Sequence, residues 1–173
     1  MILAFALLAA CAPDDVTDAT TDTADTADTA DTADTGTDGD PGVITGAWVS
    51  QGDDISDLFA AAPFNYTRID ASFAADGTYL VTSVNADGAA TDLTGTYVVD
   101  TGTNPGTIVL TQATPYAATA EGIWQVADGV LTYEVVQTVP DYGYTPPTPE
   151  SGFGATGGPN IEPGVNVQIY RAP

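Results

Sequence analysis

From Val43 onward, the chain contains eight short runs rich in valine, isoleucine, threonine and aromatic residues, separated by glycine, aspartate, asparagine and proline. Runs of this kind are typical of β-strands joined by turns. Ile69, Ala71 and Phe73 alternate with polar residues, which indicates a strand with one buried face and one wet face. The strands are expected at residues 44–50, 67–74, 78–85, 93–100, 106–112, 120–127, 129–138 and 165–171.

The connections between these runs alternate between short and long. Asp76-Gly77 and Asp128-Gly129 are tight-turn pairs, and residues 101–105 form a third short connection. The longer connections are residues 51–66, in which a two-turn helix is expected over 53–62, and residues 86–92, 113–119 and 139–164. Successive connections of an up-and-down meander emerge at opposite ends, so all the tight turns are expected at one end. We therefore predict an all-β fold, an eight-stranded antiparallel up-and-down barrel with a closed floor and a loop-rich mouth.

The amino-terminal stretch Met1–Ala10 is continuously apolar. A helix of this length covers about 15 Å, half of the ~30 Å hydrocarbon core of a bilayer, so the stretch is too short to span a membrane. Leu8-Ala9-Ala10-Cys11 resembles the lipobox of bacterial lipoproteins, although no basic residues precede it. The resemblance implies cleavage before Cys11 and attachment of lipids to its sulfur and its new amino group. Ala12, where an aspartate would imply retention in the inner membrane, favours the outer membrane in a cell that has two.

The next segment is acidic and repetitive. Residues 23–34 are four copies of Thr-Ala-Asp, and ten aspartates lie between Asp14 and Asp40 without one positive charge. Such a stretch buries too little apolar surface to fold, and its like charges hold it open. The expected organisation is a signal peptide over residues 1–10, a disordered linker over 11–42 and a barrel domain over 43–173.

The composition excludes several classes of function. The formal net charge is −22, with 24 acidic residues, two arginines and no lysine, so binding to nucleic acid is not expected. The chain has no histidine and one cysteine, which excludes imidazole catalysis, histidine-ligated metals and an internal disulfide. We expect a monomer without a metal or cofactor.

The first strand carries a motif of a known family. Gly46-Ala47-Trp48 resembles the Gly-x-Trp motif of lipocalins and their bacterial lipocalin-like relatives. The resemblance implies that an arginine near the end of the last strand, here Arg171, packs across Trp48 at the closed end as a cation–π contact. Arg171 shares its parity with Val165, Val167 and Ile169, which are taken as the inward face of that strand. The Thr-Asp-Tyr motif of the family is absent near the sixth-to-seventh turn, so the domain would be divergent; the alternative is an ordinary core tryptophan and a solvated arginine.

The ligand site of such a cup is expected inside the barrel and at its mouth. Arg68 is expected to point outward beside Asp70, away from any ligand. Tyrosines and tryptophan inside the barrel would otherwise simply fill its core. The candidate ligand-binding residues are Phe59, Phe64, Tyr79, Tyr97, Tyr116, Trp124, Tyr133, Tyr142, Tyr144 and Phe153.

The leading hypothesis is a non-catalytic, lipid-anchored protein of the cell envelope that binds a small apolar ligand. The alternative is a protein-interaction or inhibitor module that acts on another envelope protein through residues 139–164. An outsider is an aspartic hydrolase, because Val98-Val99-Asp100-Thr101-Gly102 resembles the motif of aspartic proteases. A strand end followed by turn residues explains the same motif without catalysis, and we expect no catalytic residue.

Overall fold

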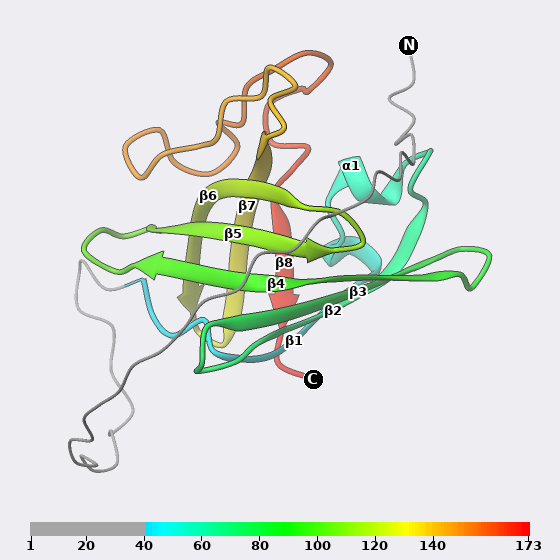
Figure 1. Ribbon diagram of the computed structural model, residues 1–173, viewed down its shortest axis with the longest axis horizontal. Coiled ribbons are helices and arrows are strands. Elements are labelled where there is room, and N and C mark those ends of the chain that lie inside the picture. Colours follow the sequence, from blue (N-terminus) through cyan, green and yellow to red (C-terminus); the bar gives the residue numbers. More distant parts are fainter. Residues whose placement is uncertain (1–40) are drawn as a thin grey trace, which may run out of the picture. The chain divides into compact units, whose positions relative to one another are not determined.

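The computed structural model describes residues 41–173, which form a closed barrel of eight antiparallel strands in chain order (Figure 1). The strands are β1 Gly46–Gln51, β2 Tyr66–Phe73, β3 Thr78–Asn85, β4 Ala90–Asp100, β5 Gly106–Thr114, β6 Ala118–Ala127, β7 Val130–Val139 and β8 Gln168–Arg171. The predicted fold class is confirmed, and each expected strand overlaps an observed one. The predictions for the signal peptide, Cys11 and the linker up to residue 40 lie outside the described residues. Within residues 41–173, no helix is long and apolar enough to cross a membrane.

Short connections at residues 74–77, 101–105 and 128–129 lie at one end of the barrel, as predicted. At the other end, the connections 86–89 and 115–117 are shorter than expected, because β4, β5 and β6 extend further into them. Only the connections 52–65 and 140–167 of the described chain are long, so these two dominate the mouth.

The connection between β1 and β2 contains two short helical turns. A 3-10 turn, η1, spans Gly52–Asp54, and a single α-helical turn, α1, spans Asp57–Ala60. Ser56 precedes α1 without a side-chain cap. The two-turn helix expected over residues 53–62 is therefore wrong: Ile55 and Ser56 are buried in non-helical backbone between the two turns.

The closed end is filled by large side chains. Pro41 is fully buried and its carbonyl accepts a hydrogen bond from the Val126 N–H at 2.6 Å. The indole of Trp48, 7 % exposed, donates to the carbonyl of Ile44 at 2.7 Å, which ties the entering chain to β1. The ring of Phe73 contacts the rings of Tyr79 and Tyr97, with centroid distances of 6.4 and 5.1 Å. The burial of each such ring contributes on the order of 2–3 kcal/mol, so this end is the stable core of the domain.

Two inward-facing glycines bring neighbouring strands close together. A Cβ on Gly122 would lie 1.9 Å from the carbonyl oxygen of Glu134, and a Cβ on Gly95 would lie 2.0 Å from that of Thr111. Because only glycine allows this approach, these positions mark places where the wall of the barrel bends.

The last strand is shorter than predicted and has the opposite parity. Gln168 and Tyr170 are buried inside the barrel, at 2 % and 5 % exposure, whereas Arg171 faces outward opposite Val49. The prediction that Val165, Val167 and Ile169 line the interior is therefore wrong. Gln168, a polar residue, occupies the inner face because its hydrogen bonds are satisfied there. The prediction assumed that the apolar residues of this strand face inward, and it therefore assigned the wrong face.

Candidate functional site: the inner wall and mouth of the barrel

Two of the candidate ligand-binding residues belong to the closed end. The hydroxyl of Tyr97 donates to the carbonyl of Ala74 in the turn between β2 and β3, at 2.9 Å. Trp124 is 1 % exposed and donates its indole N–H to the carbonyl of Thr107 at 3.1 Å. Both side chains fill the closed end of the barrel, and backbone carbonyls accept the hydrogen bonds of their polar groups.

Three tyrosines, Tyr79, Tyr133 and Tyr170, converge inside the barrel. The rings of Tyr133 and Tyr170 meet edge to face at 6.2 Å, and Tyr133 lies 6.2 Å from Phe73. Burial raises the pKa of Tyr79 to about 12, and it raises the pKa values of Tyr133 and Tyr170 further above the ordinary value of 10.0. The hydroxyls of Tyr170 and Tyr79 also raise the pKa of Tyr133. Tyr170 was missed by the sequence analysis because the parity of the last strand was misassigned.

The inner wall keeps accessible surface above the floor. Tyr133 pairs with the inward-facing Trp124 on β6, and its side chain is only half-buried. Val81, Leu93, Ala120 and Val135 also pack against the core and are only half-buried. This part of the inner wall is therefore apolar and accessible.

Polar groups are placed on the same inner wall. Gln168 donates through Nε2 to the hydroxyl of Ser50 and accepts through Oε1 from the Ser56 N–H at 3.0 Å. The side chain of Ser83, 5 % exposed, hydrogen-bonds to Tyr66. Ser56 Oγ, by contrast, is the one fully enclosed side-chain oxygen without a partner among the described residues. The interior thus combines apolar walls with fixed hydroxyl and amide groups, the combination that orients small ligands.

Aromatic side chains frame the mouth. Phe59, Phe64 and Tyr66 pack together, with ring centroids 5.4–5.9 Å apart. Burial raises the pKa of Tyr116, and the nearby hydroxyls of Tyr142 and Tyr66 raise it further. Tyr116 and Tyr142 are 40 % and 44 % exposed. The mouth therefore presents exposed aromatic side chains.

The long connection 140–167 is held against the outside of the barrel. Glu134, on the outer face of β7, is completely buried and accepts hydrogen bonds from the Gly154 N–H at 2.6 Å and the Thr156 N–H at 3.1 Å. Ile123, which pairs with Glu134 on the neighbouring strand, is also fully buried. This connection rises above β6 and β7 in Figure 1. Its middle part covers the outer wall and does not form a lid over the mouth.

Two further candidates, Tyr144 and Phe153, lie in this connection. Thr145 forms an isolated β-bridge with Gly157, and Tyr144 lies next to Gly158, where any added Cβ would strike its ring. Tyr144 and Phe153 are both half-buried. Among the described residues, the ring contacts of Tyr79 and Tyr133 include neither Tyr144 nor Phe153.

Both arginines form ion pairs on the outside of the barrel. Arg68 pairs with Asp70 at 2.6 Å, which confirms its predicted outward direction. Arg171 pairs with Asp54 at 2.9 Å, and its side chain is 59 % exposed. The predicted cation–π contact with Trp48 is wrong, because Trp48 points inward and Arg171, in register with Val49, points outward.

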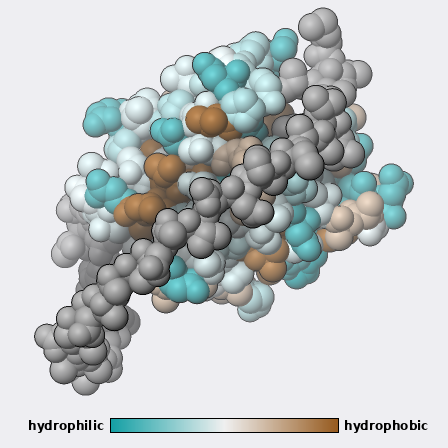
Figure 2. Space-filling view, in the orientation of Figure 1, coloured by the Kyte–Doolittle hydropathy of each residue, from teal (hydrophilic) through white to brown (hydrophobic). Residues whose placement is uncertain are grey.

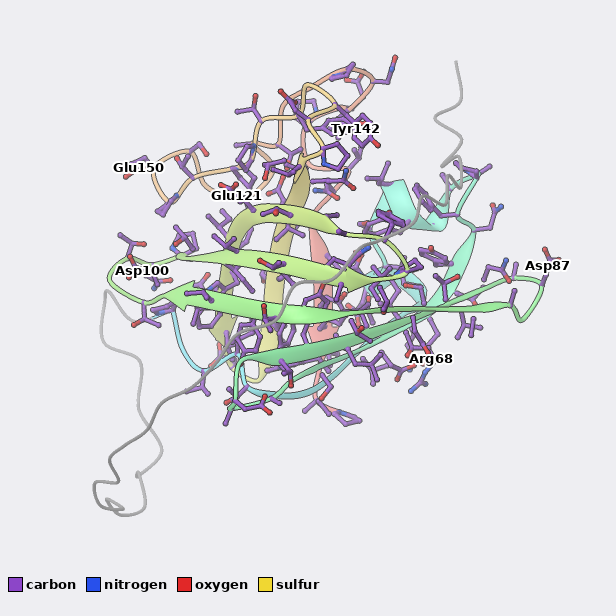
Figure 3. The ribbon with its side chains drawn as sticks, viewed as in Figure 1. Arg68, Asp87, Asp100, Glu121, Tyr142 and Glu150 are labelled. Atoms are coloured by element: carbon purple, nitrogen blue, oxygen red, sulfur yellow. The ribbon has the colours of Figure 1, made fainter. Side chains whose placement is uncertain are left out.

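The protease-like motif is part of a turn. Asp100 Oδ1 accepts the Gly102 N–H at 2.8 Å, and the carboxylate is exposed at the closed end of the barrel. Figure 3 shows Asp100 and Asp87 at opposite ends of the molecule. Among residues 41–173, no group of three or more metal-binding side chains comes together.

Comparison with known proteins found no matching family model, no matching curated protein and no matching solved structure.

Proposed function

We propose that this chain is a lipid-anchored protein of the cell envelope whose barrel binds a small apolar molecule without catalysis. The observation that carries the binding proposal is the set of inward-facing residues Tyr133, Val81, Leu93 and Val135, which pack against the core and keep accessible surface. Apolar ligand surface buried against Val81, Leu93 and Val135 would supply the binding free energy, at about 25 cal/mol per Å². The hydroxyls of Tyr79 and Tyr133 would orient the ligand.

The lipocalin-like assignment remains part of this proposal. The up-and-down order of eight strands supports it, as does the position of Gly46-Ala47-Trp48 in β1 at the closed end. The ion pair of Arg171 with Asp54 departs from the family pattern, so the assignment rests on topology and on one short motif.

The anchoring proposal rests on Leu8-Ala9-Ala10-Cys11. Its test is the mass of the amino-terminal peptide of the protein purified from its own cells. We expect a peptide that starts at Cys11 and carries acyl chains, and a Cys11→Ser variant that stays unlipidated and leaves the membrane fraction. A mature wild-type chain with an unmodified cysteine would overturn this part. Lipidation would place the protein at the outer membrane in a cell that has two.

The binding proposal is tested by titration with a neutral fluorescent naphthylamine probe and by native mass spectrometry for a co-purified molecule. An Ala120→Phe variant adds a ring on the inner wall and should weaken binding, whereas Thr111→Phe adds one on the outer face and should not. Absence of probe binding in the wild type, or equal binding in both variants, contradicts a ligand inside the barrel.

A second candidate is a protein-interaction module that acts through the connection predicted at residues 139–164, which runs from residue 140 to residue 167 in the structure. The anchoring of this segment by Glu134 favours it, because a segment held in one conformation loses little entropy on docking. Ala120→Phe, which weakens ligand binding inside the barrel, would leave such a protein interaction intact. Partner capture that survives in Ala120→Phe and disappears in Tyr142→Ala would therefore favour this candidate.

A further inference from the structure

The charges at the mouth have one sign. The connections at that end carry no lysine or arginine, and outside the part of 140–167 that packs along the outer wall their carboxylates are Asp53, Asp54, Asp57, Asp87 and Asp141. Asp54 is neutralised by Arg171 on the outside of the barrel. The remaining charges are part of a chain whose formal net charge is −22, so a ligand approaching the mouth meets a negative potential.

The interior offers no positive charge to an anionic ligand. The chain has two cations, and both Arg68 and Arg171 point away from the inner wall into ion pairs with aspartates. The polar groups that line the interior are the neutral side chains of Ser50, Ser83 and Gln168, together with tyrosine hydroxyls. A carboxylate or phosphate that entered the barrel would lose its hydration without gaining a charged partner, which is costly.

The mouth does offer a partner for a cation. Tyr66 begins β2, and Tyr116 and Tyr142 lie in the connections 115–117 and 140–167, all at the mouth end of the barrel; the last two are 40 % and 44 % exposed. An ammonium group over an aromatic face is attracted by the ring quadrupole, and cages of several such rings recognise quaternary ammonium ligands. Figure 3 shows Tyr142 on the connection above the strands, close to the mouth end of β6 and β7.

We propose that the barrel selects apolar molecules that carry an ammonium group, with the apolar part against the inner wall and the ammonium among Tyr66, Tyr116 and Tyr142. This inference rests on the proposed function and goes beyond it by naming the class of ligand. The negative potential attracts the cation, the tyrosine faces hold it, and the absence of interior cations disfavours the equivalent acid.

The test uses three probes with the same alkyl chain and different head groups: trimethylammonium, hydroxyl and carboxylate. Each displaces the neutral naphthylamine probe from the folded protein below its micelle-forming concentration. We expect the ammonium probe to bind about tenfold more tightly than the alcohol, a difference of about 1.4 kcal/mol, and the carboxylate to bind most weakly. High salt should weaken binding of the ammonium probe and leave the alcohol unchanged.

A variant pair locates the ammonium group. Tyr142→Leu keeps an apolar side chain and removes the ring face, so it should reduce the preference for ammonium over alcohol severalfold. Tyr144→Leu, in the same connection but packed beside Gly158, should leave that preference unchanged.

The outcomes separate the two proposals. If the alcohol binds and the ammonium binds no more tightly, the selectivity is overturned and the binding function stands. If the preference for ammonium is the same in Tyr142→Leu and Tyr144→Leu, the assignment to the mouth tyrosines is overturned. If none of the three probes displaces the naphthylamine, or if the naphthylamine itself does not bind, the proposed function fails.

Discussion

Glu134 and Thr156 are bound to each other twice: the carboxylate accepts both the backbone N–H and the side-chain hydroxyl of Thr156, across 22 residues of sequence. Gly154 donates a further N–H to the same carboxylate at 2.6 Å. Asn166 adds a hydrogen bond from Nδ2 to the carbonyl of Val135 at 2.7 Å. The connection 140–167 is thus attached to the barrel wall by one buried acceptor and one amide.

Removal of this acceptor should release the connection. Glu134→Ala leaves the N–H groups of Gly154 and Thr156 without their partner, and each buried unsatisfied donor costs about 1–3 kcal/mol. We expect a lower free energy of unfolding and faster amide hydrogen exchange at these two residues. Glu150→Ala, in the exposed part of the same connection, is the control. Unchanged exchange at Gly154 and Thr156 in Glu134→Ala would contradict the attachment.

The two residues that the family resemblance paired should behave independently. Trp48→Ala removes a buried ring and should lower the free energy of unfolding by about 3–5 kcal/mol, measured by denaturant titration. Arg171→Ala removes an exposed ion pair with Asp54, so it should change stability little and remove a small dependence on salt. If Arg171→Ala lowered the free energy of unfolding as much as Trp48→Ala does, the predicted cation–π contact would be supported after all.

The glycines of the wall should resist even one added methyl group. Gly122→Ala places a Cβ against the carbonyl of Glu134, which strand shifts can relieve only at a cost of about 1–3 kcal/mol. Gly157→Ala is the matched control, because its Cβ would meet Thr145 at an ordinary 3.5 Å. Thermal unfolding of both variants checks the difference, and equal melting temperatures would refute the close approach.

The buried tyrosines should make the fold sensitive to alkali. The folded-state pKa is about 12 for Tyr79 and is raised for Tyr133 and Tyr170 also, against 10.0 in the unfolded chain. The unfolded chain therefore releases protons first, so their contribution is complete below pH 10 and is lost as the pH rises through about 12. We expect tyrosinate absorbance of these residues to appear together with the loss of folded-state tryptophan fluorescence. Complete tyrosine ionisation in a still-folded barrel would show that the hydroxyls are not buried.

Two exposed valines on the outer surface of the barrel show that strand propensity does not depend on burial. The outward residues Val98 and Val109 face each other across β4 and β5 and are 71 % and 39 % exposed. Figure 2 shows apolar side chains over these strands beside hydrophilic ones. Propensity correctly gave both strands here, because β-branched side chains favour extended backbone whether or not they are buried.

The strands, their order and the tight turns could be predicted from the sequence because each depends on neighbouring residues. Asp76-Gly77 and Asp128-Gly129 form hairpin turns wherever the rest of the chain goes, and Gly77 and Gly129 adopt the positive φ that such turns require. The candidate site was predicted in part: Tyr79 and Tyr133 lie inside the barrel, and the aromatic residues of the first connection lie at its mouth.

The remaining features depend on partners far away in the chain. Gln168 faces the interior because it forms hydrogen bonds with Ser56 and Ser50, 112 and 118 residues earlier in the chain. Since side chains alternate along a strand, Tyr170 then also faces inward and Arg171 faces outward. Glu134 is buried because a later connection supplies its donors. The sequence by itself determined a meander of eight strands and its acidic charge. Only the tertiary structure decided which polar groups enter the interior and where the long connection packs, because the cost of burying a polar group depends on partners that only the folded chain brings within reach.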